Sequence, residues 1–515
     1  MSKKFLSDQE EFVVRPWLQY LLLALVVVLA PTVITIFHRI YIHPLRKIPG
    51  PTLAAASDFY GFYHNFFKGG GYSKRFRDFH VRYGSPVIRI GPNHVHVNSP
   101  EFFEEVFHIG SKYSKDPAFY KNFGGIDSML DPEDFRTYRT HISPLYSARS
   151  ADGLTPRLLT ELQAIGKRLE QNVGTGAVVN IQKLFRTLSA DMVLRLLFPQ
   201  GINLFEFDGY HPFLDAFDTI MTKTWLSEYP GFLAPLLTYP LVGMLLGLIP
   251  GSSFAKVNLA YNQQYCEGWA NDAQLLRATK KERVRDSHMT RYLDIDPTER
   301  QKAKAIIHPL EDVFNFVAGG SDTTAYTMSC AVHYLLNSPG ALTKLQAELD
   351  QSSRFIRGDF DHKKVQKLPY LNAVIKESLR LSSPVPGCLP RIVPSGGARV
   401  GSIYIPAGTA VSVSLLCLQQ NEKLFPEPQK FRPERWLGEE GKLIEKWNIA
   451  FSRGPRQCVG TNIAYLELHS CLAYLFSHFE LALPSDGKNQ LNWVDRFVAT
   501  NVKEVGIIVV KNRWI

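Results

Sequence analysis

The sequence lacks the marks of several common protein classes. It has only six cysteines in 515 residues, and none of them forms a Cys-x-x-Cys pair or a zinc-binding spacing. So few cysteines in so long a chain do not indicate a disulfide framework, and we expect most of them to be small buried apolar residues. Asn-x-Ser/Thr glycosylation sequons are also absent. Both absences favour a domain that stays in a reducing compartment.

Blocks of charge of one sign are missing too. The net charge is +10, but the lysines and arginines are spread along the whole chain. Without a basic block or a nucleic-acid motif, this charge favours an acidic partner or surface and argues against nucleic acid. Hydrophobic residues make up 45% of the chain and charged residues 21%, so a large core can form and general disorder is excluded.

One long hydrophobic run stands out near the N-terminus. Residues 17–37 (WLQYLLLALVVVLAPTVITIF) contain no charged residue, and the run is long enough to cross a bilayer as a helix. A cleaved signal peptide is the alternative, but the run is too long and lacks a good cleavage site. Three Lys or Arg residues stand close to each end, so charge does not set the orientation. We predict a tail over 1–16, a transmembrane anchor over 17–37, a Pro-rich hinge over 38–51 and one domain over 52–515.

The chain after the hinge contains one motif that points to a bound cofactor. Residues 451–460 read FSRGPRQCVG, followed by a segment of helical periodicity. Gly454 and Gly460 permit tight turns near a bulky planar ligand. Arg456 can neutralise a carboxylate, and Cys458 lies at a helix N-terminus, where a low pKa of its thiol is expected. A thiolate in this setting is suited to be an axial ligand of heme iron.

The pattern F-x-x-G-x-R-x-C-x-G resembles the heme-binding signature of the cytochrome P-450 superfamily, and every fixed position is present from Phe451 to Gly460. The resemblance implies heme b with Cys458 as the thiolate ligand of the iron, in a loop that includes Phe451, Gly454 and Arg456. It also implies the cytochrome P-450 fold, mainly α with small β-sheets, preceded here by one transmembrane helix. The helical patterns after residue 52, with short β-like runs at 86–97 and 398–413, agree with this fold. Residues 52–515 would form the heme-thiolate monooxygenase domain.

A second motif lies inside a long helical pattern at residues 310–337. Gly319 and Gly320 each destabilise a helix interior by about 1 kcal/mol relative to alanine, so something is expected to approach the backbone closely. Asp322 and Thr323 add a carboxylate and a hydroxyl at the same point. A kinked core helix is the alternative. The segment AGGSDTT is similar to the oxygen-binding groove of the family, which implies that Thr323 hydrogen-bonds dioxygen and that Asp322 helps to relay protons.

A third pattern concerns buried charge. Glu377 and Arg380 lie at i,i+3 spacing on a predicted amphipathic helix over 368–381. An ordinary solvated pair is the alternative. The family's E-x-x-R motif and its later Pro-Glu-Arg segment match these residues and Arg435. The resemblance implies a buried Glu377–Arg380–Arg435 triad that supports folding and heme retention rather than chemistry.

Three arginines have positions that suit the two heme propionates: Arg139, Arg391 and Arg456. The segment around Arg139 departs from the family pattern, because Phe135 stands where a Trp or His is usual. Phe135 cannot donate a hydrogen bond, which puts one propionate contact in doubt and leaves Arg136 as a substitute donor.

The resemblance is to microsomal members of the family. It implies an endoplasmic-reticulum location with the domain facing the cytosol, and electrons delivered by an NADPH-dependent reductase. The apolar residues 225–250 would border a substrate entrance that dips into the bilayer, with ordinary buried core as the alternative. A heme-thiolate isomerase or dehydratase and a heme-based sensor are the competing hypotheses, and the Asp322–Thr323 pair favours a monooxygenase over both.

The substrate is indicated less sharply. Residues 43–147 are similar to fungal enzymes of secondary metabolism, among them trichodiene-oxygenase-like enzymes that oxidise terpenoids. Four largely apolar segments are expected to form the pocket: 119–129, 316–324, 384–389 and 498–505. We therefore expect a lipophilic small molecule, a terpenoid or related skeleton, while polyketide and alkaloid substrates remain alternatives.

Overall fold

The computed structural model describes residues 29–121, 123–222, 252–279, 285–294, 309–357, 360–484 and 491–513. Two predicted segments fall largely or wholly outside this part of the chain. These are the anchor over 17–37, of which only the helical residues 29–37 are described, and the apolar segment 225–250. Within the described ranges, no helix combines the length and the apolar character that a membrane crossing requires.

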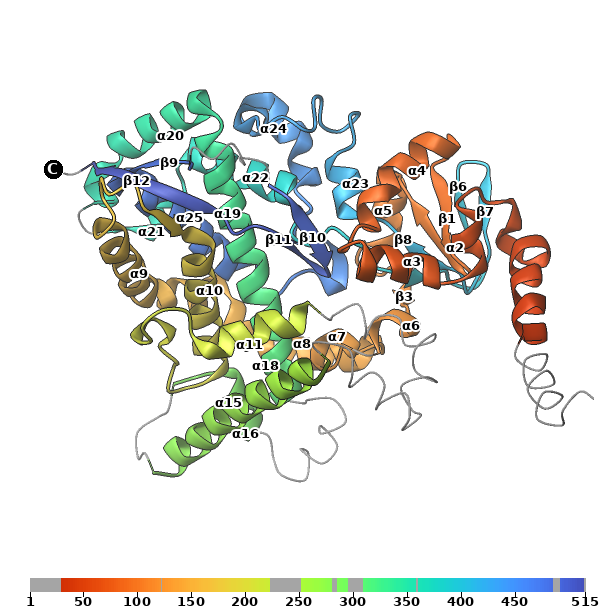
Figure 1. Ribbon diagram of the computed structural model, residues 1–515, viewed down its shortest axis with the longest axis horizontal. Coiled ribbons are helices and arrows are strands. Elements are labelled where there is room, and N and C mark those ends of the chain that lie inside the picture. Colours follow the sequence, from red (N-terminus) through yellow and green to blue (C-terminus); the bar gives the residue numbers. More distant parts are fainter. Residues whose placement is uncertain are drawn as a thin grey trace, which may run out of the picture.

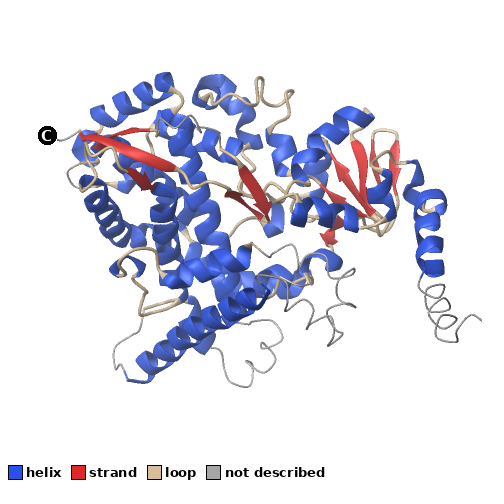
Figure 2. Ribbon diagram, viewed as in Figure 1, coloured by secondary structure: helices blue, strands red, loops and turns tan. Residues whose placement is uncertain are grey.

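Within the described ranges the protein is mainly helical and has four small sheets, which agrees with the predicted mainly α fold with small β-sheets. A large helical part lies to the left in Figure 1, and a smaller part built around β1 and β8 lies to the right, next to the N-terminal helix. Figure 2 shows the strands in separate small groups, at the upper left, near the middle and in the right-hand part, rather than in one central sheet. The site must therefore be built mostly from helices and the loops between them.

The helices divide into those before and those after a central helical segment, residues 309–336. Before it stand α2 (Thr52–Ala56), α3 (Phe59–Phe62), α4 (Phe76–Tyr83), α5 (Pro100–Val106), α6 (Pro117–Tyr120), α7 (Gly125–Ser128), α8 (Pro132–Ile142), α9 (Ala148–Glu170), α10 (Ile181–Leu197), α11 (Pro212–Met221), α15 (Ser252–Thr279) and α16 (His288–Asp294). After it stand α20 (Pro339–Gln351), α21 (His362–Val365), α22 (Pro369–Ser382), α23 (Leu415–Gln419), α24 (Gly438–Ile444) and α25 (Thr461–His478).

The strands are short. The largest sheet has the order β1-β2-β8-β5-β3, with β2 and β8 parallel and its other pairs antiparallel. The remaining sheets are β4-β12-β9 and the hairpins β10-β11 and β6-β7. The strands are β1 (Val87–Gly91), β2 (His94–Val97), β3 (Ser114–Lys115), β4 (Val178–Asn180), β5 (Arg391–Ile392), β6 (Ala398–Val400), β7 (Ile403–Ile405), β8 (Ala410–Ser412), β9 (Phe479–Ala482), β10 (Trp493–Arg496), β11 (Val498–Asn501) and β12 (Gly506–Asn512). The β-like runs predicted at 86–97 and 398–413 are thus confirmed.

The central segment is one continuous helical rod with a change of winding in its middle. It consists of α18 (Pro309–Val317), a single wider π-helical stretch η7 (Ala318–Asp322) and α19 (Thr323–Leu336). Such π-bulges are rare and often mark functional sites. The stretch coincides with the glycine pair and Asp322, and α10 packs against it. This rod passes through the helical part in Figure 1.

The main core surrounds α19 and α25. Helix α25 is apolar on nearly all sides, and Leu468, Cys471 and Leu475 are each 1% exposed or less. A helix without a polar face is expected to be buried on every side. Because α25 follows directly on the Cys458 loop, the rigid core fixes the position of that loop.

Candidate active site

A cavity of about 240 Å³ lies among the loop 451–460, the start of α25, the η7 segment and α8. Six of the predicted site residues line it: Arg139, Gly319, Gly320, Arg391, Arg456 and Cys458. Parts of the chain as distant as α8 and the start of α25 therefore meet in one space. Apolar side chains such as Phe316, Leu389 and Ile463 supply much of the remaining wall.

The loop carrying Cys458 is held in a tight conformation. The backbone N–H of Cys458 donates to the Phe451 carbonyl over 3.0 Å, and the Phe451 ring packs on Tyr465. Gly454 has φ +75°, and a Cβ at this residue would lie 2.7 Å from the Phe107 carbonyl oxygen. Only glycine fits there without displacing backbone. The resulting turn presents the Cys458 side chain to the cavity.

The protonation of Cys458 differs from the expectation. Burial raises the pKa of the Cys458 thiol, and the backbone N–H of Gly460, the charge of Arg139 and the hydroxyl of Thr461 oppose this rise only in part. The prediction that the helix N-terminus makes this pKa low is therefore wrong for the polypeptide alone, because desolvation of a thiolate outweighs a helix dipole. A coordinated metal cation deprotonates a thiol outright, so a metal ligand fits this position.

Three positively charged side chains meet in the cavity wall. Arg391 and Arg456 meet there with Lys115 of β3, which the sequence reading missed. Burial, with the nearby charges of Arg456 and Arg391, lowers the pKa of Lys115 to about 7, and burial lowers the pKa of Arg456 to about 10. The half-exposed Asp127, whose Oδ1 lies 3.9 Å from Lys115 Nζ, opposes this shift in Lys115 only in part. Lys115, Arg391 and Arg456 are hereafter the cation cluster. The two arginines carry positive charge that suits a ligand with carboxylates, and a carboxylate bound there would favour the protonated form of Lys115 as well.

Arg139 takes a different place from the other arginines. Its Nη1 donates to the Gln457 carbonyl over 2.9 Å, which ties α8 to the residue before Cys458. Its guanidinium also lies close enough to Cys458 to act on the charge of the thiol. Arg139 therefore braces the cysteine loop while it lines the cavity.

The two glycines of η7 have different surroundings. A Cβ on Gly320 would collide with the Cγ2 of Val193 on α10, whereas a Cβ on Gly319 would meet nothing within 4 Å. Gly320 therefore serves the close packing of two helices, and Gly319 keeps the cavity wall open. The Oγ1 of Thr323 donates to the Gly319 carbonyl over 2.6 Å. Among the described residues that line the cavity, Thr324 is present and Thr323 is not.

Asp322 is ion-paired with Arg186, a buried residue of α10 that the sequence reading did not single out. The same guanidinium lies 2.9 Å from Asp218 on α11. The sequence does not predict this contact, because Arg186 and Asp322 stand far apart along the chain. The pair joins the motif acid to two helices that flank it.

The Glu377, Arg380 and Arg435 side chains are in contact and at most 1% exposed. Arg380 donates to both oxygens of Glu377 over 2.8 Å, and Arg435 Nε donates over 3.1 Å. The Trp436 indole N–H and the Arg432 backbone N–H complete the shell around the carboxylate. Every charge here is hydrogen-bonded, which is what a buried ionic group requires. The group lies outside the cavity wall.

Phe135 and Arg136 lie on different faces of α8. Phe135 is buried and lines the cavity, and its ring centre lies 3.6 Å from Cζ of Arg456. Arg136 is exposed and is not among the described cavity-lining residues. The structure thus gives Arg136 no place in the cavity wall, and its role as a substitute donor stays a prediction.

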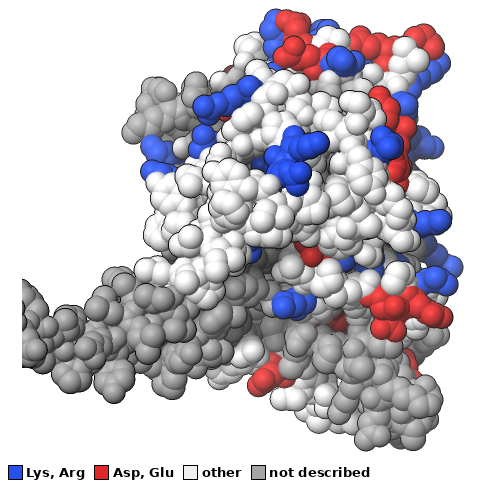
Figure 3. All heavy atoms as spheres, turned by 90° about the vertical axis from the view of Figure 1, so that its right-hand side faces the viewer, with Lys and Arg blue, Asp and Glu red and all other residues white. Residues whose placement is uncertain are grey.

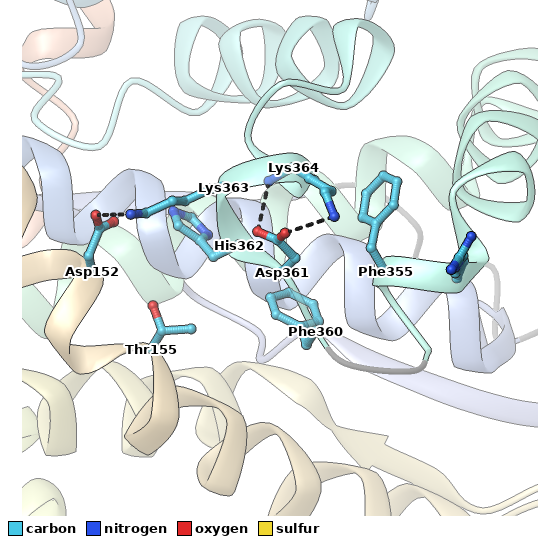
Figure 4. A pocket seen from close by; sticks show the side chains of 9 residues that line it. Asp152, Thr155, Phe355, Phe360, Asp361, His362, Lys363 and Lys364 are labelled. Carbon is cyan, nitrogen blue, oxygen red and sulfur yellow. Dashed lines mark hydrogen bonds and ion pairs between the residues drawn. The ribbon is translucent and has the colours of Figure 1, made fainter.

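The predicted pocket segments contribute unequally. Residues from 119–129, 316–324 and 384–389 line the cavity. No described residue of the fourth segment, 498–505, is part of the cavity wall, although the preceding residue Phe497 is. A second hollow opens at the surface between α9 and α21 (Figure 4). Two of its lysines are paired with acids, Lys363 with Asp152 and Lys364 with Asp361. None of the predicted site residues is among the described residues around it.

Comparisons with known proteins agree with this geometry. A family model described as "Cytochrome P450" matches residues 58–504. Over 501 residues the chain is 49% identical to "Cytochrome P450 monooxygenase cloA" of Claviceps purpurea (strain 20.1), covering 97% of both proteins. It is 46% identical over 481 residues to "Inactive cytochrome P450 monooxygenase cloA" of Claviceps fusiformis, covering 93% of this chain and 92% of that relative.

The fold has a counterpart among solved structures. The crystal structure of the "cytochrome P450DA heme domain" matches with a TM-score of 0.71 at 18% identity and covers 90% of this chain and 98% of that one. At this identity the match speaks for the fold alone. The family model and the full-length relatives decide the assignment: the chain belongs to the cytochrome P450 family, an oxidoreductase family of monooxygenases that carry heme ligated through a cysteine thiolate.

Proposed function

We propose that this protein inserts one oxygen atom from dioxygen into a lipophilic small molecule, by hydroxylation or epoxidation, with Cys458 as the iron ligand. The observation that carries the proposal is that Cys458, Gly319 and the cation cluster line one cavity. These residues fit a heme: a sulfur for the metal, cations for the propionates and an open wall where the glycine stands. When bound, heme supplies the activation of dioxygen.

The chain's own residues would hold the cofactor and move protons. Arg391 and Arg456 would bind the propionates, and Arg139 would keep the cysteine loop in place through Gln457. The Thr323 hydroxyl donates to Gly319 and retains lone pairs that accept a further hydrogen bond. Asp322 would pass protons toward the cavity, held in orientation by Arg186.

The substrate we propose is a terpenoid or a related intermediate of fungal secondary metabolism, with a polyketide or alkaloid skeleton as the alternative. Three phenylalanines support an apolar ligand: Phe119, Phe123 and Phe497 form a cluster with ring centres 4.9 to 6.4 Å apart. Phe497 belongs to the cavity wall. Such tilted aromatic faces favour rigid apolar skeletons.

We further propose that the protein is attached to the endoplasmic reticulum by residues 17–37, with the domain in the cytosol and an NADPH-dependent reductase as electron donor. The face that carries the N-terminal helix has broad uncharged areas with scattered lysines and arginines (Figure 3). Exposed apolar side chains continue from this helix onto the next elements: Val33, Ile34, Phe37, Leu53, Phe59 and Phe67. Such a surface is suited to the interfacial layer of a membrane.

The proposal is tested with the full chain in microsomes together with a reductase. The dithionite-reduced protein is exposed to carbon monoxide, and the Soret band is recorded for the wild type and for Cys458→Ser. We expect the strongly red-shifted band of a thiolate-ligated heme in the wild type only. A red-shifted band that survives in Cys458→Ser would exclude Cys458 as the ligand. Product analysis with terpenoid, polyketide and alkaloid candidates, NADPH and dioxygen then decides the substrate class.

A further inference from the structure

One contact in the cavity, between Phe135 and Arg456, could not be predicted from the sequence motifs. Phe135 projects from α8 and is 6% exposed, and its ring centre lies 3.6 Å from the Cζ of Arg456. At this distance the guanidinium lies in van der Waals contact with the ring. Arginine favours this arrangement because its planar group stacks on aromatic faces and gains cation–π attraction.

We propose that Phe135 is a positioning residue, which holds Arg456 ready for a heme propionate by stacking against its guanidinium. A Trp or His in its place would bind the propionate directly. Phe135 instead acts through Arg456, so the departure from the family pattern changes how the contact is made and does not remove it.

The other contacts of Arg456 leave the ring as its main support. Nη2 donates only over 3.3 and 3.4 Å, to the carbonyls of Leu130 and Asp131. Nη1 is buried and has no hydrogen-bond partner among the described residues. A buried guanidinium nitrogen without an acceptor is unfavourable. This nitrogen therefore marks the place where an acceptor from a ligand is expected.

Asp127 and Asp131 both lie close enough to act on the charge of Arg456, and Asp131 is engaged elsewhere. The Asp131 carboxylate accepts from the backbone N–H groups of Glu133 and Asp134 at the start of α8. It thereby caps its own helix. A carboxylate placed against Arg456 would neutralise the guanidinium and occupy its donors. An aromatic face stabilises the same cation and leaves the N–H edges available.

The other members of the cation cluster also lie next to aromatic rings. The Arg391 guanidinium lies 5.1 Å from the Phe107 ring centre and 5.6 Å from that of Tyr120. The Lys115 ammonium lies 4.4 Å from the Tyr120 ring centre. Each cation of the cluster thus faces at least one aromatic ring. The Arg456–Phe135 contact is the shortest of the set, so it is the one whose loss is expected to matter most.

The rate of heme loss from the full-length holoprotein tests the proposal, measured by transfer of heme to an excess of an apo-globin. Phe135→Leu keeps apolar bulk and removes the ring, while Phe135→Trp keeps an aromatic face. We expect heme loss to become roughly two- to thirtyfold faster in Phe135→Leu, the range that a cation–π contact corresponds to. Phe135→Trp is expected to lose heme more slowly than Phe135→Leu, at a rate close to wild type.

Two controls separate positioning from packing. Phe185→Leu removes a fully buried ring on α10 outside the cavity wall, so its effect on heme loss reports general destabilisation. The double variant with Arg456→Gln completes a mutant cycle. In the Arg456→Gln background, Phe135→Leu is expected to have no further effect.

Three results would overturn the proposal. One is an equal effect of Phe135→Leu with and without Arg456, and another is an effect no larger than that of Phe185→Leu. The third is heme loss from Phe135→Trp as fast as from Phe135→Leu. If Arg456→Gln fails to retain heme at all, the comparison of Phe135→Leu with Phe185→Leu decides.

Discussion

The carboxylate of Asp322 is paired with the guanidinium of Arg186, and Asp218 of α11 lies 2.9 Å from that same guanidinium. The motif acid is therefore not a free group at the cavity. Arg186 is 7% exposed, and its charge is shared between Asp322 and the half-exposed Asp218.

This pair predicts the behaviour of two variants. Asp322→Asn is expected to slow product formation by about a hundredfold or more, the contribution of a positioned proton donor. Arg186→Gln leaves the carboxylate without its buried partner, and we expect it to impair the same step. The double variant should be no slower than Asp322→Asn if both act on one proton path. Product formed per NADPH consumed is the measurement, and additive losses in the double variant would contradict a shared path.

Neighbouring threonines allow a matched comparison. Thr323 is the motif residue and donates to the Gly319 carbonyl, whereas Thr324 lines the cavity. We expect Thr323→Val to divert NADPH and dioxygen into peroxide and water, because the hydroxyl held at Gly319 is lost. Thr324→Val removes a hydroxyl of equal size and should change coupling little. Peroxide yield per NADPH distinguishes the two, and a larger yield from Thr324→Val would move the role to Thr324.

The sequence predicts the local parts of this site better than its long-range contacts. The turn around Cys458 and the break at Gly319 and Gly320 are visible because they demand glycine within a few residues of a reactive group. Arg186 and Lys115 belong to a helix and a strand far from the motifs, and nothing in their neighbours marks them. They become functional candidates only because the fold brings α10 and β3 to the cavity.

The difference between Gly319 and Gly320 illustrates the same limit. The sequence indicates that something approaches the helix closely, and it does not tell which glycine meets protein and which meets open space. Likewise, Phe135 reads as a lost donor in the sequence, while its position against Arg456 depends on the packing of α8 on the cysteine loop.

The buried triad predicts a large effect on stability. Glu377→Gln leaves Arg380 and Arg435 buried without their counter-charge, and breaking such a network costs about 3 to 5 kcal/mol. Denaturant unfolding and the heme content of the purified protein measure this loss. Glu439→Gln is the matched control, since its partner Lys442 and Glu439 itself are both exposed and such pairs contribute about 0 to 1 kcal/mol. Equal losses in the two variants would contradict a special role for the triad.

A buried histidine pair predicts a pH dependence of stability. His80 Nδ1 donates to the Ser85 carbonyl over 2.7 Å, so His80 Nε2 must accept from His96 Nδ1, also over 2.7 Å. The Ser414 backbone N–H in turn donates to His96 Nε2. Both rings are satisfied only when neutral, because a further proton would place two donors face to face.

The direction of this pH dependence follows from the pKa shifts of the two histidines. Burial lowers the pKa of His80 and of His96 below the usual 6.5 of the unfolded chain. The unfolded chain therefore binds more protons, so the pair's contribution is complete above pH 6.5 and is lost as the pH falls below it. We expect denaturant midpoints to fall between pH 7.5 and 5.5. Other buried histidines add to this trend, so the double variant His80→Leu/His96→Leu isolates the pair. An unchanged slope in that variant would contradict the prediction.

The two glycines of η7 predict opposite outcomes for one substitution. Gly320→Ala places a methyl group against Val193, and overpacking of this kind destabilises by about 1 to 3 kcal/mol. Val193→Ala removes the obstructing atoms and should recover part of that loss. The new methyl group of Gly319→Ala meets nothing within 4 Å, and alanine replaces a poor helix former, so we expect stability to stay equal or rise by up to about 1 kcal/mol.

Because this methyl group enters the cavity wall, Gly319→Ala should lower turnover without a loss of stability. Thermal unfolding and turnover of both variants decide, and a stability loss confined to Gly319→Ala would reverse the assignment.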